Sequence, residues 1–450
     1  MKKAITLLMV VIMIFGLAAC GKGNGDGNTD NNKPGHTDDG KNNGQDSHAW
    51  DDLDWSKGAD ASGGKVTLRV TSWRQYDKAY YEEIERRFEE KYDWIDVKLE
   101  FTPSQSAYYS NIQADIVSGE APDIMDLHRG YMISYAKEGL LAPQTDFAYM
   151  DAYMDTAKDT TVLNGENYGF MVAYNYFGLI YNMDIFKKVG VQIPTTPEEM
   201  VSVVNKLKDA GYGGVAYAGA TNGSKFGRNI LEICLGSKGT ADLLNGIDNG
   251  SVLDISEAEG AKEAFETLTY YTENDIFYNA YEGISYESAV SLFAQEKSAI
   301  LYSGTYSLGE AEQTFPEINF GYFAIPTYSG NSLNAAEPAQ NACINSSCKN
   351  LGAAKLWIEF LASPEISTYF CSNSKMLSTI EGVTLENEVS QMILNSSDGF
   401  VITPTDFKNG EYWQLAYEAV FDNVMFRKAD WKEEVKALER KLEDYDLSSL

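Results

Sequence analysis

Residue types that perform nucleophilic or proton-transfer chemistry are scarce in this sequence. It contains three histidines, and two of them, His36 and His48, lie in a Gly/Asn/Asp-rich stretch. A Ser-His-Asp or Cys-His arrangement would therefore have to use His128. The sequence also has no Gly-Lys-Ser/Thr phosphate loop and no His-Glu-x-x-His zinc motif. We expect a protein that is not an enzyme and that uses no cofactor and no metal.

Cysteine chemistry is left open by the sequence. Beyond Cys20, the cysteines are Cys234, Cys343, Cys348 and Cys371. Four cysteines in an oxidising compartment can form two disulfides in any of three pairings. Buried free thiols are the alternative. No histidine lies near the last three, which argues against a zinc site.

The first twenty residues predict the compartment. Two lysines precede an uncharged apolar run over residues 4–17, which is shorter than the ~20 residues that a bilayer-spanning helix needs. Residues 1–19 are therefore expected to be a signal peptide. The ending Leu-Ala-Ala-Cys20-Gly resembles the lipobox of bacterial lipoproteins, in which the chain is cut before a cysteine that carries acyl chains. The alternative is an ordinary signal peptide with a chance cysteine.

Composition and charge limit the classes of partner that the protein can bind. Residues 20–64 are rich in Gly, Asn and Asp and too poor in apolar side chains to offset their ordering entropy, which predicts a disordered linker. The formal net charge of the chain is −30. Such a charge repels phosphate backbones and anionic lipid surfaces. We therefore expect no nucleic acid partner and a body that is tethered to the outer face of the membrane without docking on it.

The elements that must position any site follow from periodicity. The body after residue 64 exceeds the ~250–300 residues that one core supports, so two lobes are expected. Residues 65–71 and 95–101 alternate like strands, and residues 80–92 between them have helical spacing, which predicts a parallel α/β sheet. A strand is also expected from residue 122, and helices over residues 108–118, 197–210 and 431–444.

Six blocks then resemble, in the right order, the solute-binding proteins of bacterial ABC importers, the maltose-binding-protein-like family. Some positions depart from that pattern: Glu296 stands where Gly is common, Tyr306 where Trp is common, and residues 337–341 replace a usual Gly-Gly. The blocks are residues 118–124 (with Pro-Asp), 135–143, 168–190 (with Tyr-Asn-Met-Asp), 293–306, 319–326 and 353–361.

The resemblance implies an α/β, two-lobe periplasmic-binding-protein-like fold of type II. Its lobes would be joined by a multi-crossing hinge, with the ligand cleft between them. The N-terminal lobe would hold residues 65–172 plus 325–349, and the C-terminal lobe residues 173–324 plus 350–450. The protein would act as a monomer.

The resemblance also implies a function. The chain would be the lipid-anchored substrate-binding subunit of an ABC transporter, capturing a carbohydrate, expected to be an oligosaccharide, and delivering it to membrane permease subunits. A cell-surface glycosidase and a non-transport receptor or adhesin are the alternatives. The 66 acidic residues ensure that carboxylate pairs occur somewhere, so such pairs do not favour the glycosidase.

Sugar binding needs aromatic faces against C–H surfaces and polar groups for hydroxyls. Trp73 follows the first strand, where α/β sheets place ligand loops, although it could be a core or surface aromatic. Asp77 could touch ligand or cap the next helix. His128 is better explained as a structural histidine. In the same loop, the resemblance assigns ligand contact to Asp126, Arg129 and Tyr131.

The remaining candidates come from the later segments. Asn222 and Phe226 lie in a Gly/Asn-rich loop that could be a rim of the site or an exposed turn. Tyr270, Tyr271 and Tyr278 are expected in the core. The resemblance places ligand contacts at the crossing residues Tyr174 and Asn175, stacking at Tyr306 and Trp413, and further contacts at Glu337 and Gln340.

The anchoring prediction is tested by Cys20→Ala. The variant should be soluble or unprocessed, because a single acyl chain gives only marginal membrane binding and stable anchoring needs more than one. Fractionation of cells expressing both forms is the measurement. A variant that is cleaved and still membrane-bound would contradict the lipoprotein assignment.

Overall fold

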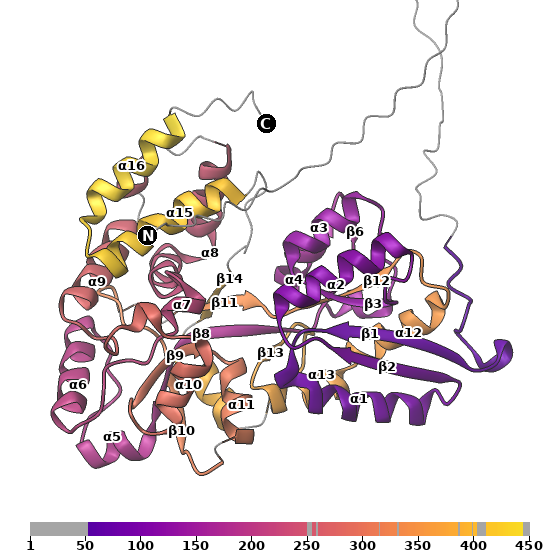
Figure 1. Ribbon diagram of the computed structural model, residues 1–450, viewed down its shortest axis with the longest axis horizontal. Helices are drawn as coiled ribbons and strands as arrows, with labels where there is room; N and C mark the ends of the chain where they lie inside the picture. The colour runs from indigo at the N-terminus through magenta and orange to yellow at the C-terminus, as the bar shows by residue number, and fades with distance from the viewer. Residues whose placement is uncertain are drawn as a thin grey trace, which may run out of the picture. The chain divides into compact units, whose positions relative to one another are not determined.

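The computed structural model has two α/β lobes, and each contains a six-stranded sheet within the described residues (Figure 1). No helix among these residues is both long and apolar enough to cross a membrane. The predicted signal peptide, Cys20 and most of the predicted linker lie outside them. The structure describes residues 53–249, 254–257, 260–314, 316–330, 333–385, 388–397, 399–402 and 411–443.

The first sheet begins as the alternating sequence predicts. β1 (Val66–Ser72) pairs in parallel with β2 (Ile95–Phe101) and with β3 (Ile124–Leu127). α1 (Lys78–Lys91) connects β1 to β2 and buries one apolar face. The later strands β4 (Leu141–Ala142), β7 (Phe170–Met171) and β12 (Asn341–Asn345) complete the sheet, and β12 runs antiparallel to β3.

Local capping explains where the helices of this lobe begin and end. The hydroxyl of Ser104 accepts the backbone N–H of Ala107 at the start of α2 (Gln105–Ser118), and Gly119 ends that helix at φ 76°. The other elements are α3 (Arg129–Lys137), α4 (Asp155–Thr161), α12 (Leu351–Leu361), α13 (Pro364–Ser374), the hairpin β5 (Val162–Leu163) and β6 (Glu166–Asn167), and the 3-10 turns η1 (Ala61–Gly63), η2 (Gln75–Asp77) and η3 (Ala148–Asp151).

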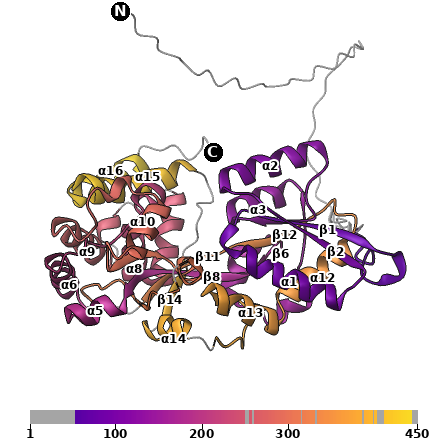
Figure 2. The same ribbon diagram turned by 60° about the horizontal axis from the view of Figure 1, so that its bottom comes forward.

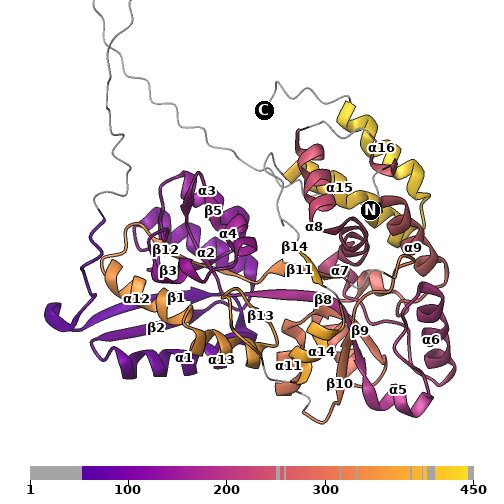
Figure 3. The same cartoon turned by 180° about the vertical axis from the view of Figure 1, so that it is seen from behind.

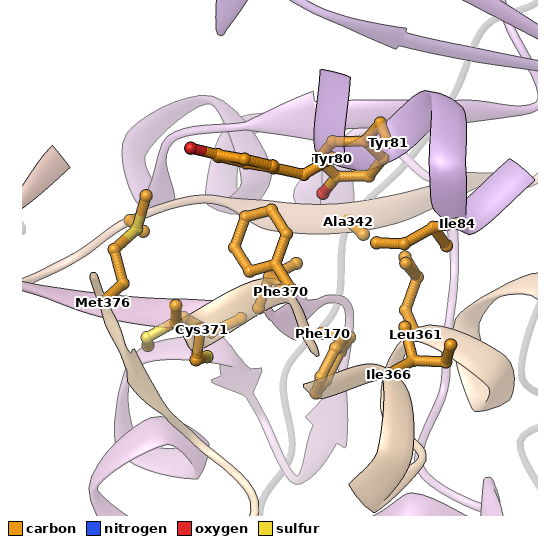
Figure 4. Close-up of a cluster of buried hydrophobic side chains, with 14 of the residues drawn as sticks. Tyr80, Tyr81, Ile84, Phe170, Ala342, Leu361, Ile366, Phe370, Cys371 and Met376 are labelled. Carbon is orange, nitrogen blue, oxygen red and sulfur yellow. The ribbon is translucent and has the colours of Figure 1, made fainter. Parts of the chain in front are cut away.

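Aromatic packing holds α12 and α13 against α1, and Figures 2 and 3 show the three helices side by side. The rings of Phe88 and Trp357 meet edge to face with centroids 5.1 Å apart, and neither is exposed. Figure 4 shows the continuation of this core, where Phe370 of α13 lies beside Tyr80 and Tyr81 of α1. The first sheet therefore takes its helical cover both from α1, early in the sequence, and from α12 and α13, more than 250 residues later.

The second sheet is built around β8 (Ala173–Asn182), whose ten residues are all buried. This strand follows directly on the first lobe and runs into the second (Figure 1). Its partners, all antiparallel, are β9 (Ile300–Gly304), β10 (Phe320–Phe323), β11 (Leu333–Pro338) and β13 (Leu377–Ser378), and β14 (Gly399–Ile402) pairs with β11 in parallel.

The helices of the second lobe also follow sequence signals. Pro197 opens α6 (Pro197–Asp209), and the hydroxyl of Thr196 accepts the backbone N–H of Glu199. The other elements are α5 (Met183–Val189), α7 (Gly219–Asn222), α8 (Lys225–Asn249, kinked at Gly236), α9 (Ala261–Glu273), α10 (Tyr286–Ala294), α11 (Tyr306–Thr314), α14 (Glu388–Asn395), α15 (Glu411–Arg427), α16 (Trp431–Glu443), η4 (Ile255–Glu257) and η5 (Tyr281–Gly283).

The lobe boundaries differ from those we expected. We placed residues 325–349 in the first lobe, yet β11 lies in the second sheet and the chain returns to the first sheet only at β12. We placed all residues after 349 in the second lobe, yet α12 and α13 pack on α1. The reason is the apolar face around Trp357, which is fully buried against the first sheet.

Residues 53–64, which we assigned to the disordered linker, lie against the first lobe, and we call them the strap. The ring of Trp55 meets Phe147 edge to face at 5.2 Å. The indole of Trp94 donates to the Gly58 carbonyl at 3.1 Å, and the Gly352 N–H donates to the Lys57 carbonyl at 2.8 Å. The ordered body therefore begins by residue 53 at the latest.

The four described cysteines are free thiols. Cys343, Cys348 and Cys371 are buried and Cys234 is half-buried. Burial raises the pKa of the Cys371 thiol to about 12, so this thiol is unreactive at neutral pH. Of the two alternatives that the sequence left open, the structure has the free thiols.

Gly352 is the position at which the strap meets α12 most closely. A Cβ on Gly352 would lie 2.5 Å from the Trp55 carbonyl oxygen and 2.8 Å from the Ala59 nitrogen, both of them backbone atoms. We expect Gly352→Ala to displace the strap and to lower the free energy of unfolding by about 1–3 kcal/mol.

Limited proteolysis near residue 57 and urea unfolding are the measurements. Gly63→Ala is the matched control, because a Cβ at Gly63 meets no atom within 4 Å. Equal protease resistance of the Gly352 variant and the unmodified protein would contradict the packing described.

Candidate functional site

Aromatic and charged side chains gather where β1 and β3 end. Trp73, directly after β1, is half-buried, and its ring lies 4.8 Å from His128, which follows β3. Tyr108 and Tyr109 of α2 pack on the same indole with centroids at 5.3 and 5.6 Å. Because parallel strands end at one edge of a sheet, this is where the sequence predicted a ligand loop.

A buried ion pair between Arg74 and Asp77 holds the turn that follows β1 at this edge of the sheet. The Nε of Arg74 lies 2.6 Å from the Asp77 carboxylate, and the two side chains are 3% and 1% exposed. The guanidinium also donates to the Ala339 carbonyl at 3.2 Å, in the segment between β11 and β12. Burial raises the pKa of Asp77, against the opposing effect of Arg74. Asp77, a predicted ligand contact, is therefore placed as the partner of Arg74.

Asp126 and Gln340 point into the first lobe. Asp126 accepts a hydrogen bond from the Ser72 hydroxyl at 2.6 Å, and Gln340 donates to the hydroxyl of Tyr81. Together with apolar side chains they line a cavity of about 20 Å³. This is close to the minimum for one water molecule and far too small for a solute. Both residues were predicted to touch ligand, and the structure places them in the support behind the site.

The second lobe contributes aromatic rings and an ion pair. Tyr306, at the start of α11, stacks on Tyr76 of the first lobe with centroids 5.7 Å apart and planes 27° apart. Phe177 of β8 lies 6.2 Å from Tyr306, and the Lys225 ammonium lies 4.3 Å above the Phe177 ring. The ammonium is paired with Glu337 of β11 at 2.8 Å.

The stacking of Tyr76 on Tyr306 joins the residues of the two lobes, and charges from both lobes act on His128. Burial, followed by the positive charges of Arg74 and Lys225, lowers the pKa of His128 to about 4, and the charge of Glu337 acts in the opposite direction. Charged residues from the turn after β1, from α8 and from β11 thus influence the imidazole that follows β3. At neutral pH this imidazole is uncharged. We call Trp73, Tyr76, His128, Lys225, Tyr306 and Glu337 the junction cluster.

Several predicted residues lie elsewhere. Arg129 donates to the Thr160 carbonyl at 3.1 Å. The ring of Tyr131 stacks on the ring of Tyr109 with centroids 3.7 Å apart, and Tyr109 in turn packs on Trp73. Tyr174 is 1% exposed, and its hydroxyl donates to Thr156.

Phe226 is fully buried in the second-lobe core, because its loop continues directly into α8. Tyr271 is also in the core, as expected, whereas Tyr270 is half-buried. Trp413 belongs to α15, but its side chain lies outside the described residues.

Asn175 and Asn222 border the second-lobe part of the cluster. Asn175 is opposite Glu337 in the β8–β11 register, and its Oδ1 is buried without a hydrogen-bond partner. Asn222 ends α7, and its Nδ2 is likewise buried and unpartnered. Both were predicted from the sequence, and both present hydrogen-bonding atoms that the protein itself does not use.

Sequence reasoning missed the charged residues that α8 and α15 of the second lobe place near the junction cluster. Lys225 and Arg228 lie one turn apart on α8, and Arg228 pairs with Glu418 of α15 at 3.1 Å. Asp422, one further turn along α15, has its pKa raised by burial. Tyr76 was also missed. The only available signals were the position of Lys225 in the Gly/Asn-rich loop and of Tyr76 three residues after Trp73.

The arrangement can stack on flat apolar surfaces and exchange hydrogen bonds. Its one histidine is neutral and packs on an indole. In the part of the chain that the structure describes, no three His, Cys, Asp or Glu side chains come together as a metal site. Stacking faces beside buried amides are features of a binding site.

The pKa of Asp126 generates a pH prediction. Burial raises it to about 7, against ~3.9 in an unfolded chain. A raised folded-state pKa means that the neutral carboxyl favours folding. This contribution is complete below pH ~4 and is lost as the pH rises through about 7. Asp126→Asn should therefore gain stability relative to the unmodified protein between pH 5 and pH 8.

Urea midpoints at four pH values measure this difference. Subtraction of the two proteins cancels the opposite effect of His128, whose depressed pKa removes stability as the pH falls. Asp155→Asn is the control, because the Asp155 side chain is 94% exposed. A stability difference that does not change with pH would contradict the assignment of a neutral Asp126.

Comparison with known proteins identifies the family of the chain. The family model described as "Bacterial extracellular solute-binding protein" matches residues 71–367. The multiple sugar-binding protein of Streptococcus mutans is 23% identical over 313 residues, which cover 68% of this chain and 74% of that protein. The alpha-glucosides-binding periplasmic protein AglE of Rhizobium meliloti is 23% identical over 402 residues, 81% and 85% of the two chains.

Solved structures share the fold. The apo form of RafE from Streptococcus pneumoniae superimposes with a TM-score of 0.68 at 20% identity, covering 84% of this chain and 97% of that chain. The GacH receptor of Streptomyces glaucescens has a TM-score of 0.69 at 18% identity, with coverages of 85% and 100%. These findings confirm the predicted two-lobe periplasmic-binding-protein fold and the predicted family. Because the family model spans more than half of the sequence, the chain belongs to the bacterial extracellular solute-binding proteins, which are binders and not enzymes.

Proposed function

We propose that this protein is the substrate-binding subunit of an ABC importer, and that it captures an oligosaccharide between its two lobes and delivers it to membrane permease subunits. The observation that carries the proposal is the junction cluster. Trp73 and Tyr76 come from one lobe and Tyr306 from the other, next to amides and an ion pair. Aromatic faces beside polar groups match the alternating C–H and hydroxyl surfaces of a sugar.

The names of similar proteins support this ligand class. The relatives named above are a multiple sugar-binding protein and an alpha-glucosides-binding protein. RafE has been solved in complex with raffinose, and a sugar transporter of Bacillus licheniformis in complex with stachyose. These ligands belong to those proteins, and they define the first compounds to try here.

Lipid anchoring is the second part of the proposal. It is supported by the apolar run, the Leu-Ala-Ala-Cys20-Gly sequence and the Gly/Asn/Asp-rich stretch that follows. An anchored subunit would stay close to its permease on the outer face of the membrane. The flexible composition of the stretch suits a tether.

The proposal predicts stabilisation by ligand. A solute that binds only the folded protein adds about 2.7 kcal/mol at a hundredfold excess over its dissociation constant. Thermal unfolding with raffinose, stachyose and maltotriose should therefore show a rise in melting temperature for at least one of them. Small-angle scattering with that sugar should show a smaller radius of gyration. Failure of all three sugars, together with stabilisation by a peptide or polyamine, would overturn the oligosaccharide assignment.

Tyr306→Ala is the site-specific control for this experiment. Removing a stacking ring should weaken sugar binding by about tenfold or more while the ligand-free melting temperature changes little. Tyr271→Ala is the contrasting variant, because Tyr271 is fully buried in the second lobe. That change should cost about 3–5 kcal/mol of stability instead. A Tyr306 variant that loses stability and keeps its affinity would place Tyr306 in the core.

A further inference from the structure

The positive charges around the junction cluster are already neutralised by the protein. Lys225 pairs with Glu337 at 2.8 Å, Arg228 with Glu418 at 3.1 Å, and Arg74 with Asp77 at 2.6 Å. His128 adds no charge at neutral pH, because burial lowers its pKa to about 4. An anionic ligand would therefore have to compete with a carboxylate for each of these cations.

Several buried polar atoms in this region, in contrast, have no hydrogen-bond partner within the protein. Asn175 Oδ1 and Asp422 Oδ1 can accept, and Asn222 Nδ2 and Arg228 Nε can donate, yet all four atoms are buried without a partner. Folded proteins rarely leave buried polar atoms unsatisfied, because each one costs stability. A hydroxyl both donates and accepts, so a polyol can satisfy atoms of both kinds.

The residues that carry these atoms belong to segments that neighbour Lys225 and Glu337. Asn175 is opposite Glu337 in the sheet. Asn222 closes α7 just before α8 begins, and Asp422 Oδ1 lies 3.8 Å from the place where a Cβ on Gly223 would be. Against the effect of burial, the charges of Glu232, Glu418 and Glu337 raise the pKa of Arg228. Two unpartnered acceptors and two unpartnered donors thus come from segments that carry or adjoin this ion pair.

We infer that the site selects an uncharged, hydroxyl-rich ligand, and that the Lys225–Glu337 pair is the determinant that excludes charged sugars. This inference rests on the proposed function and narrows its ligand class. The pair is held in place, because Lys225 also lies over the Phe177 ring and the two side chains are only 20% and 14% exposed. A carboxylate on the ligand would meet Glu337, and an ammonium would meet Lys225. Each juxtaposition of like charges opposes binding.

Breaking the pair from either side should reverse the selectivity. Glu337→Gln leaves the ammonium of Lys225 free to bind a carboxylate on the ligand. Lys225→Met leaves the carboxylate of Glu337 free to bind an ammonium. The matched control is Asp242→Asn, which breaks the exposed Lys238–Asp242 pair of the same helix, where the side chains are 90% and 64% exposed.

The experiment measures dissociation constants by calorimetry for the purified full-length protein and the three variants. Raffinose and maltotriose are each used in three forms: unmodified, with one primary hydroxyl oxidised to a carboxylate, and with one replaced by an ammonium. We expect the unmodified protein to prefer the neutral form of whichever sugar binds. Glu337→Gln should shift the acidic-to-neutral affinity ratio by about tenfold or more towards the acidic form, and Lys225→Met should shift the cationic ratio likewise.

The charged-to-neutral affinity ratio is informative even if a variant binds all sugars more weakly, because both affinities are measured on the same folded protein. Tighter binding of a charged form by the unmodified protein would overturn the inference and leave the proposed function intact. Ratios that move no more in the two pair variants than in Asp242→Asn would also overturn it. Absence of binding by all six sugars would instead count against the proposed function itself.

Discussion

The guanidinium of Arg74 is a permanent charge with 3% of its side chain exposed, and the junction between the lobes is arranged around satisfying it. A charge of this kind is stable in a protein interior only when it is paired and hydrogen-bonded. Asp77 supplies the pairing from the turn after β1, and the Ala339 carbonyl supplies a hydrogen bond from the segment that returns to the first lobe. Removing one partner of a buried ion pair costs about 3–5 kcal/mol, so the Asp77 turn is held firmly against Arg74. The hydrogen bond adds a weaker link to the Ala339 segment.

The positions of the surrounding side chains follow from this constraint. Trp73 precedes Arg74 and is turned towards α2, whereas Tyr76 lies two residues later and meets Tyr306. The return at Ala339 aligns β11 with β8, which brings Glu337 opposite Asn175 and within reach of Lys225. One buried cation therefore influences the positions of residues from three distant segments of the chain.

Local signals in the sequence were sufficient for several helices and strands and for the family. The alternation in β1 and β2, the proline that opens α6 and the glycine that ends α2 each act within a few residues. The six blocks placed the chain among solute-binding proteins, the family model confirms this, and the solved structures share the fold. Trp73 was predicted as a ligand contact because it follows a strand, Tyr306 because it occupies a family stacking position, and Glu337 because it precedes the last crossing between the lobes. All three lie in the junction cluster, and their contact with a ligand stays a prediction.

What could not be predicted depends on contacts between distant residues. Arg74 and Ala339 are separated by 265 positions, so no local period reveals their bond. Phe226 was read as a rim residue because its loop is rich in Gly and Asn, yet the segment folds into α8 and buries the ring completely. The lobe assignment of α12 depended on the packing of Trp357 against Phe88, which neither segment indicates alone.

The strap gives the protein a defined point of mechanical loading. A pull on the chain from before residue 53 reaches the body through Trp55, Lys57 and Gly58, which contact Phe147, Gly352 and Trp94 of the first lobe. The load therefore enters α12 and the edge of the first sheet and does not pass along β8 or the Ala339 segment.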